Sequence, residues 1–423
     1  MSAAWVLVHR LLRWGLWLLA GVLIVAALYV SLGRQLAPLV AEYRVEIEQQ
    51  LQATLQQEIK IEQLEGGWRG FSPLLTARYV TLGEGENAIQ VESLYVQPDV
   101  IASLLNGQLR LKNLTLSGLQ IQVQEDSAGR WTLQGLVLQE TEERAFELNE
   151  VLAKLGQIQQ LSVLDSRIII QADGQEPLAL TYAGFTLRQT GAQQYLALRA
   201  VLPDGEVLQL SAQAQLMQDD WRQSQLALYL NTPSTNLAPW IAARYLHEWQ
   251  LNTLKVGAQL WLQAEHGQVQ HAALQFDTLE LHGQHADAEP VQISSDAVSA
   301  FYQQHEGEQT LWFERLALTI DQRPERDLRL RASYSNADAA HWQLAMAQLD
   351  VADVHYMVER VLALPEVATD VLASMQPAGV LENLQVDWYP EAPLAERLSF
   401  VSNVRDIEFS AWHDVPASSG ING

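Results

Sequence analysis

The segment from Trp14 to Leu32, WGLWLLAGVLIVAALYVSL, is a run of nineteen residues without a charged side chain. At a rise of about 1.5 Å per residue, a helix of this length measures about 28 Å, which matches the hydrocarbon thickness of a bilayer. The run is longer than the apolar part of a signal peptide, and no small-residue cleavage site follows it. A cleaved signal peptide is therefore the weaker alternative, and we predict a retained membrane anchor over residues 1–33.

Aromatic side chains lie toward both ends of this run. Trp14 and Trp17 are near its start and Tyr29 is near its end, and amphipathic rings of this kind favour the headgroup region of a bilayer. Leu23 lies near the centre of the run, at the depth of the acyl chains. These four residues are the predicted contacts of the anchor with the membrane.

The orientation of the anchor rests on a narrow balance of basic residues. Arg10 and Arg13 precede the apolar run. Arg34 and Arg44 follow it, so the excess of Lys and Arg that marks the cytoplasmic side is tied. The α-amino group and His9 tip the balance toward the short side. We therefore expect a single-pass protein with a cytoplasmic N-terminus and the remaining chain outside the cytoplasm.

The composition excludes several classes of partner and site. The chain carries 26 basic and 50 acidic residues, a net charge of −24, so it lacks the basic surface that displaces counterions from nucleic acid phosphates. It has no cysteine, which excludes disulfides, thiolate metal ligands and a cysteine nucleophile. We therefore expect no nucleic acid partner.

Residues 34–60 follow the anchor with a helical pattern. Apolar residues recur at three- and four-residue steps from Leu36 to Ile59, with Pro38 near the start, which predicts an amphipathic helix of about six turns. The favoured interpretation packs one face of this helix on the domain that follows. A coiled-coil seam between two chains is the alternative, and it is weaker because the pattern keeps no strict heptad.

From residue 74 onward the spacing of apolar residues changes to two, and this period returns almost to the end of the chain. In Val256–Ala264, for example, Val256, Leu260 and Leu262 share one face of a strand, while two glutamines share the other. About fifteen to twenty segments of this kind predict strands.

Short helices interrupt these strands. They are predicted at Pro98–Asn106, which Gly107 should end, and at Phe146–Leu155, Asn236–Trp249 and Asp353–Leu364. They are too few for the crossovers that parallel strands need, so the sheet should be antiparallel. The predicted fold class is mainly β: an N-terminal transmembrane helix, followed over residues 61–423 by an elongated, twisted antiparallel sheet with a few short helices.

A short pattern recurs in which apolar residues are spaced by three and then by two. Its copies are Val91, Leu94, Val96; Leu111, Leu114, Leu116; Ile158, Leu161, Val163; Phe276, Leu279, Leu281; Phe313, Leu316, Leu318; Leu381, Leu384, Val386; and Val404, Ile407, Phe409. A spacing of three places two residues on opposite faces of a regular strand. Each copy therefore predicts a bulge, which restores a common face and increases the twist.

One face of the predicted sheet is apolar. Either a second sheet covers it, which makes a sandwich, or it remains open as an apolar groove. An uncovered apolar surface of that size marks a ligand or membrane site. The candidate groove residues are Leu109, Leu111, Val256, Leu260 and Leu262.

The segment EGGWRGFSP, from Glu65 to Pro73, carries three glycines and one proline, which predicts a tight backbone feature between strands. It is no phosphate loop, because the spacing GxxxxGK[ST] is absent. We interpret Trp68 and Phe71 as aromatic side chains over the end of a core, with a ligand contact as the alternative.

Patterns typical of catalysis are absent, since the sequence contains neither HExxH nor GxSxG. The nearest approach to a metal site is HGQHADAE, with His282, His285, Asp287 and Glu289, which we interpret as a solvated polar turn. We therefore expect no enzyme activity, no cofactor and no metal.

Several segments together resemble a known family. LLNGQL, from Leu104 to Leu109, and the later turn GRWTL, from Gly129 to Leu133, resemble the N-terminal signature of AsmA-like envelope proteins. EGGWRGFSP, LAPW at Leu237–Trp240 and PAGVLENL at Pro377–Leu384 are similar to the YhdP branch of that family. The segments span nearly the whole chain, and their order is more specific than any one of them.

The resemblance implies a Gram-negative inner-membrane protein whose β-groove projects into the periplasm, related to the chorein-type bridge-like lipid transfer proteins. It implies phospholipid acyl chains as the ligand, and outer-membrane or periplasmic proteins as partners of a further C-terminal part. Members of the YhdP branch are usually longer. We therefore expect this chain, which ends at Gly423, to be a fragment or a truncated product.

Two functions of different classes follow from these patterns. The first is conduction of phospholipids between the inner and the outer membrane along the groove. The second is an anchored, non-enzymatic scaffold with a closed, dry core that assists outer-membrane assembly. Lipid bound to the groove would distinguish the first from the second.

Overall fold

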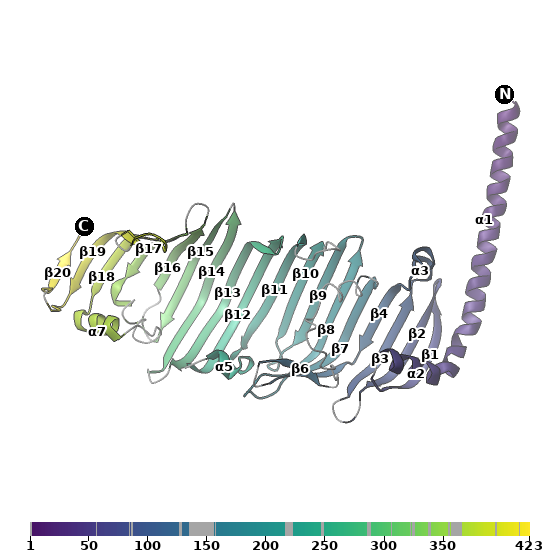
Figure 1. Cartoon of the computed structure of the whole chain (residues 1–423), viewed down its shortest axis with the longest axis horizontal. Helices are drawn as coiled ribbons and strands as arrows, with labels where there is room; N and C mark the ends of the chain where they lie inside the picture. The colour runs from purple at the N-terminus through teal and green to yellow at the C-terminus, as the bar shows by residue number, and fades with distance from the viewer. Residues whose placement is uncertain are drawn as a thin grey trace. The chain divides into compact units, whose positions relative to one another are not determined.

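The computed structural model describes residues 2–423 except 56, 84, 86–87, 127–128, 135–155, 157, 216–222, 247–248, 286–288, 306, 322, 324–325, 337–339, 354–355, 357–365, 394–395 and 414. The chain is mostly β, with a large, twisted, predominantly antiparallel sheet and few helices, as the sequence predicted (Figure 1). It divides into two compact units. Unit 1 comprises residues 1–122, 133–168 and 182–190, and unit 2 comprises 123–132, 169–181 and 191–423.

The helices and strands have the following bounds. The helices are α1 Ser2–Leu36, the 3-10 helix η1 Ala37–Tyr43, α2 Arg44–Leu55, α3 Val100–Asn106, the 3-10 helix η4 Ala238–Trp240, α5 Ala243–Leu246 and α7 Glu366–Met375. The strands are β1 Ile59–Arg69, β2 Ser72–Leu82, β3 Ile89–Pro98, β4 Leu111–Ser117, β5 Gln120–Glu125, β6 Trp131–Gln134, β7 Gln160–Gln171, β8 Leu178–Thr190, β9 Gln193–Val201, β10 Val207–Gln215, β11 Gln225–Asn236, β12 Trp249–Glu265, β13 Gln268–His285, β14 Val291–His305, β15 Glu308–Ile320, β16 Arg326–Ser335, β17 His341–Asp350, β18 Ala378–Trp388, β19 Leu398–Phe409 and β20 Ser418–Ile421.

The N-terminal helices confirm one prediction and correct another. Within the described residues, one helical stretch, Arg13–Ala53, is long and apolar enough to cross a membrane, which fits an anchor. The single amphipathic helix predicted over residues 34–60 is wrong, because η1 begins at Ala37, with Pro38 in its first turn, and separates α1 from α2. Ile59 belongs to β1 and is buried there, since its alternation with Ile61 is that of a strand.

The predicted packing of this region by one face is confirmed. Val40 of η1 and Ile47 of α2 pack against a buried cluster made by Ile59, Ile61, Leu64 and Ala77. This cluster is the hydrophobic core of unit 1 next to the anchor. It gives α2 its position on the first strand of the sheet.

Helix α2 also forms hydrogen bonds with backbone groups of β1, on the edge of this strand that does not pair with β2. Gln52 Nε2 donates to the Ile59 carbonyl oxygen at 2.9 Å, and the Ile61 N–H donates to Glu48 Oε1 at 2.7 Å. Arg44 Nη1 donates both to the Ile61 carbonyl oxygen at 2.7 Å and to Glu48 Oε1 at 2.9 Å. These three side chains are four residues apart on one helix face, so they cover an edge that would otherwise pair with another chain.

Unit 1 contains a parallel pair of strands, a departure from the antiparallel sheet. Strands β1 to β4 pair with their neighbours antiparallel, but β4 pairs with β7 in parallel. The predicted antiparallel sheet is confirmed as a whole, and this pair departs from it locally, because β5, β6 and the residues up to Gln160 lie between the two strands in sequence and supply the long connection that a parallel pair needs. The pair aligns two copies of the recurring apolar pattern, with Leu111, Leu114 and Leu116 opposite Ile158, Leu161 and Val163.

The bulges predicted from the recurring pattern are confirmed at five of its copies. The strand pairing skips one residue at Lys112, at Asp277 and at Glu314. Two residues face a single residue of the partner strand at 383–384 and at 406–407. In the last two, Asn383 and Asp406 have φ of 51°. The spacing of three therefore leaves the apolar residues of each copy on one face.

The structure confirms one of the predicted short helices and shortens another. Helix α3 ends at Gly107, whose φ of 67° is the left-handed stop expected there, and Asp99 caps its start. The helix predicted over Asn236–Trp249 is shorter, because its first turn is η4 and Trp249 already begins β12. Phe146–Leu155 and most of Asp353–Leu364 lie outside the described residues, and α7 was not predicted.

In unit 2, strands β9 to β19 follow one another as an antiparallel series in sequence order. Figure 1 shows this series side by side, from teal to yellow. Because each strand pairs with the next along the chain, residues opposite each other share a face of the sheet. The register of these pairs therefore decides which side chains form each face.

We predict that Glu48→Ala lowers the free energy of unfolding by about 1–3 kcal/mol, because it leaves the N–H of the buried Ile61 without an acceptor. The measurement is denaturant unfolding of the full chain in detergent micelles. The matched control is Glu46→Ala, which removes an exposed acid from the same helix. Equal stability of the two variants would contradict the proposed role of Glu48 at the strand edge.

Candidate functional site

The apolar residues of unit 2 line up across the strands in two unbroken rows. The first row is Leu198, Leu210, Leu230, Leu260, Leu274, Ala300, Phe313, Leu330, Met346 and Leu384. The second row is Leu196, Ala212, Leu228, Leu262, Ala272, Tyr302, Leu311, Ala332, Leu344, Val386 and Phe400. We call these two rows the unit 2 apolar face. It contains no charged side chain over eleven strands.

The opposite face of the same strands is more polar, although one of its rows includes Tyr229, Trp261, Phe301 and Trp312. One row across β9 to β15 is Arg199, Gln209, Asn231, Gln259, Gln275, Ser299 and Arg315. On β18, burial raises the pKa of the Asp387 carboxyl, but hydrogen bonds from Gln343, His341 and Gln385 outweigh it and lower that pKa. Asp387 therefore stays ionised. It lies on the side of β18 opposite the apolar rows.

The unit 2 apolar face is not packed like a protein core. Among the residues of its two rows, all of which the structure describes, only Ala300 and Leu384 are buried. Leu311 and Phe400 are exposed, and the others are half-buried by their neighbours on the sheet. A second sheet over this face would bury most of these side chains, so the sandwich alternative does not fit. An exposed apolar surface of this kind marks a site for a ligand, a membrane or another protein.

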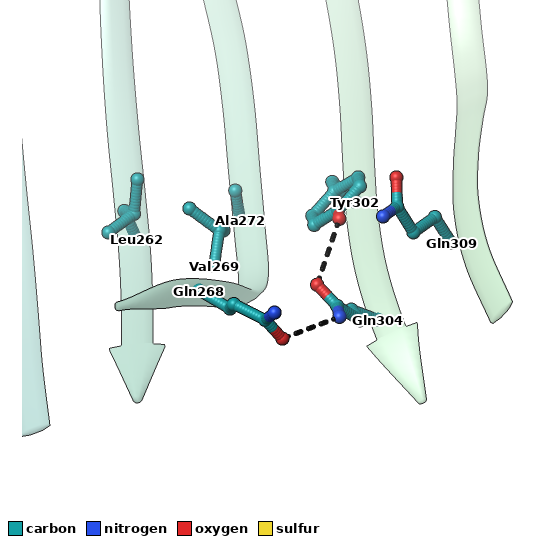
Figure 2. A pocket seen from close by; sticks show the side chains of 7 residues that line it. All are labelled: Leu262, Gln268, Val269, Ala272, Tyr302, Gln304 and Gln309. Carbon is teal, nitrogen blue, oxygen red and sulfur yellow. Dashed lines mark hydrogen bonds between the residues drawn. The ribbon is translucent and has the colours of Figure 1, made fainter. Parts of the chain in front are cut away.

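A pocket of about 520 Å³ opens on this face at one end of β12 to β15 (Figure 2). Leu262, Val269 and Ala272 form its apolar part. Gln309 and a hydrogen-bonded set of polar residues complete the lining: the Tyr302 hydroxyl donates to Gln304 Oε1 at 3.4 Å, and Gln304 Nε2 donates to Gln268 Oε1 at 2.9 Å. The lining is amphipathic and contains no charged side chain, which suits a ligand with an apolar chain and a polar end.

Unit 1 has an apolar face of its own. One row is Leu64, Ala77, Leu94, Leu116 and Val163, and the next is Gly66, Leu75, Val96, Leu114 and Leu161. The first row includes the buried cluster that α2 covers. The second row leads to the C-terminal end of the anchor helix.

A second cavity of about 520 Å³ lies in unit 1 where α1 and η1 meet β1, β2 and β3. Its lining is Tyr29, Leu32, Gly33, Leu36, Ala37, Val40, Gly66, Gly67, Trp68, Pro73, Leu74, Leu75, Val96 and Pro98. Leu75 and Val96 belong to the unit 1 apolar face, and Leu32 and Leu36 belong to the anchor. The cavity is therefore lined jointly by α1, η1 and the start of the sheet, almost entirely with apolar groups.

Two glycines allow the helical segment and the sheet to approach so closely. A Cβ atom on Gly33 would lie 2.2 Å from the Trp68 ring, and a Cβ atom on Gly66 would lie 1.8 Å from the Ala37 carbonyl oxygen. The Tyr29 ring meets the Trp68 ring edge to face, with centroids 5.2 Å apart. The glycines of EGGWRGFSP thus serve two purposes: Gly66 gives close contact, and Gly70, with φ of 63°, makes the turn between β1 and β2.

The structure brings most of the predicted groove residues onto these faces. Leu260 lies in the first row of the unit 2 apolar face and Leu262 in the second, and Val256 lies opposite Leu279 further along β12. Leu111 opens β4 beside Pro98 on the unit 1 apolar face. Leu109 is placed differently, because it precedes β4 and is exposed next to α3. Binding of lipid by any of them stays a prediction.

The predicted anchor residues all lie on α1. Trp14, Trp17 and Leu23 are exposed along it, as a helix in a bilayer requires, and Tyr29 contacts Trp68. The prediction that Trp68 and Phe71 cover the end of a core is wrong, because Phe71 is exposed in the turn and Trp68 packs on the anchor. The repeated glycines beside Trp68 were the sequence signal for this close approach.

The histidines of HGQHADAE lie elsewhere than predicted. His282 and His285 are the end of β13 and not part of a turn, since the strand runs to His285. Asp287 lies outside the described residues. In the part of the chain that the structure describes, no three His, Cys, Asp or Glu side chains are grouped to hold a metal.

Comparison with known proteins places the whole chain in one family. The family model described as YhdP protein matches residues 1–423. None of the curated proteins and none of the solved structures matches the chain.

We predict that Gly33→Val destabilises the packing of the anchor on β1 by about 1–3 kcal/mol, because the added side chain overlaps the Trp68 ring. The shift in thermal unfolding of the full chain in detergent measures this effect. Gly21→Val is the matched control, since a Cβ atom on Gly21 of the same helix meets nothing within 4 Å. The same small shift in both variants would show that α1 does not pack on Trp68.

Proposed function

Because this chain belongs to the YhdP family, we propose that it conducts phospholipids between the inner and the outer membrane, with acyl chains held on its apolar faces. Membership of this family indicates a lipid-related function in the cell envelope. The apolar helix α1 fits a membrane anchor. In the proposed arrangement α1 crosses the inner membrane once, with the N-terminus in the cytoplasm and the chain after α1 in the periplasm.

The single observation that carries this proposal is the unit 2 apolar face. Two rows of apolar side chains continue without a charge, one across ten strands and the other across eleven, while the face remains open to a ligand. An acyl chain on such a surface gains about 0.8 kcal/mol for each CH₂ group that it fully buries. Since one row resembles the next, the affinity varies little along the face, and a lipid can move along it without a deep trap.

The pocket of Figure 2 supports a place for the polar end of the lipid. Gln268, Gln304 and Tyr302 present amide and hydroxyl groups beside the apolar part formed by Leu262 and Val269. Ester carbonyl and phosphate oxygens accept hydrogen bonds from groups of this kind. The absence of a charged residue among the lining residues fits transient binding of zwitterionic and anionic phospholipids alike.

The cavity between α1 and the first strands supports uptake from the membrane that α1 crosses. Leu32 and Leu36 of the anchor and Leu75 and Val96 of the unit 1 apolar face line the same space. An acyl chain that leaves the bilayer beside α1 meets this lining before it meets water. The proposed activity makes and breaks no covalent bond, so we assign the chain no catalytic residue.

The alternative of a scaffold with a closed, dry core is less well supported. A dry core requires the apolar side chains to be buried, and only Ala300 and Leu384 of the two described rows are. The two functions differ in one observable, which is whether lipid contacts the unit 2 apolar face.

We predict that a photo-crosslinking amino acid at Leu260 forms adducts with phospholipid in living cells. The same amino acid at Gln259, the adjacent residue on the polar face, serves as the control and should give at least about tenfold less adduct, because adjacent residues of a strand face opposite sides. Mass spectrometry of the purified chain identifies and counts the adducts. Equal labelling at both positions, or none at either, would count against lipid on this face.

We further predict that Leu262→Asp lowers phospholipid crosslinking at Leu344, which lies further along the same row, by about tenfold, because a charge in an apolar path opposes passage. Gln263→Asp places the same charge on the polar face and should leave the crosslinking unchanged. Thermal unfolding of both variants is measured in parallel. Normal crosslinking in a folded Leu262→Asp variant would exclude conduction along this row, and a loss of several kcal/mol of stability would favour the closed scaffold.

A further inference from the structure

Helix α3 presents its large apolar side chains to solvent. Ile101, Leu104, Leu105 and Leu109 are 66%, 80%, 82% and 68% exposed. The first three lie at positions i, i+3 and i+4, so they form one helix face, and Leu109 follows in the adjacent loop. We call these four residues the α3 surface. A helix on the surface of a globular domain normally turns such residues inward.

The polar residues of α3 hold the helix in this unusual orientation. Asp99 Oδ1 accepts a hydrogen bond from the Ala102 N–H at 2.9 Å, and the Asp99 N–H donates to the Arg110 carbonyl oxygen at 2.8 Å. Ser103 Oγ accepts from the Arg110 N–H at 2.9 Å, and Asn106 Nδ2 donates to the Ala102 carbonyl oxygen at 2.7 Å. The polar side chains are thus hydrogen-bonded to the backbone of the helix and its loop, while the large apolar side chains face solvent.

The α3 surface begins beside the membrane helix. Val96 and Pro98, at the end of β3, line the same cavity as Leu32 and Leu36 of α1. Helix α3 starts two residues after Pro98. The α3 surface is therefore continuous along the chain with the region where the anchor meets the sheet.

The charge near the α3 surface is opposite to that of the whole chain. In a protein of net charge −24, the segment from Pro98 to Lys112 contains Asp99 as its single acid and Arg110 and Lys112 as its bases. Both basic residues are exposed and lie one and three residues after Leu109. Apolar side chains flanked by Lys and Arg suit the boundary between acyl chains and anionic headgroups.

We propose that the α3 surface inserts into the phospholipid bilayer that α1 crosses, as a second membrane contact of unit 1. The leucines enter the acyl region, and Arg110 and Lys112 reach the headgroups. This contact holds the end of β3 and the start of β4 at the membrane, next to the cavity at the end of α1. The inference rests on α1 as the anchor and is independent of lipid conduction.

The test uses the full chain, which has no native cysteine, reconstituted in vesicles of phosphatidylethanolamine and phosphatidylglycerol. Leu105→Cys carries an environment-sensitive fluorophore. We expect quenching by nitroxide-labelled lipid and protection from aqueous iodide. Gln90→Cys, an exposed position at the other end of β3, is the control, and its fluorophore should show the reverse. Because both probes lie on the same unit, the control also reports the fraction of chains that face the outside.

A second variant separates insertion from simple proximity. In a chain with Leu104→Ser and Leu105→Ser, a fluorophore at Leu109→Cys should lose most of its nitroxide quenching, by about fivefold to tenfold. A probe at Leu105 that iodide reaches as readily as the control would overturn the proposal. Protection from iodide without nitroxide quenching would also overturn it, since that result indicates a protein partner or a second copy of the chain at the α3 surface.

Discussion

The alternation of side chains along a β-strand is the constraint on which this structure depends. A shift of one residue in register moves every side chain of a strand to the other face. An apolar face over eleven strands therefore requires a pairing register that places the apolar residues of each strand opposite those of the next. Leu230, Leu260 and Leu274 show this in three adjacent strands, because each lies directly opposite the next. Where two apolar residues are three positions apart, a bulge returns both of them to the same face.

The bulges also explain residues that look misplaced in a strand. Asn383 and Asp406 take up φ of 51°, a conformation that Asn and Asp tolerate better than most residues. Each lies inside a copy of the recurring pattern, between its first two apolar residues. The polar residue turns the backbone so that Leu381 and Leu384, three residues apart, serve the same face. The sheet thus gains twist without losing its apolar face.

The attachment of the anchor depends on close approach of backbone atoms. Gly33 makes room for the Trp68 ring, and Gly66 makes room for the Ala37 carbonyl oxygen. Helix α2 then covers the open edge of β1 with Arg44, Glu48 and Gln52. This edge would otherwise expose unpaired N–H and C=O groups at the first strand of the sheet. The same segment therefore ends the sheet, joins it to the membrane helix and leaves an apolar cavity between them.

The sequence by itself determined the properties that depend on local spacing and composition. These are the length of the anchor, the period of two that makes strands, the bulges, the stop of α3 at Gly107, and the choice of Leu260 and Leu262 for an apolar face. Each follows from residues within a few positions of one another. Only the tertiary structure decided the parallel pairing of β4 with β7, the contact of Trp68 with Gly33, the outward face of α3, and the openness of the unit 2 apolar face. These depend on which distant backbones meet and on what covers a side chain, and no periodicity along one strand or helix encodes that information.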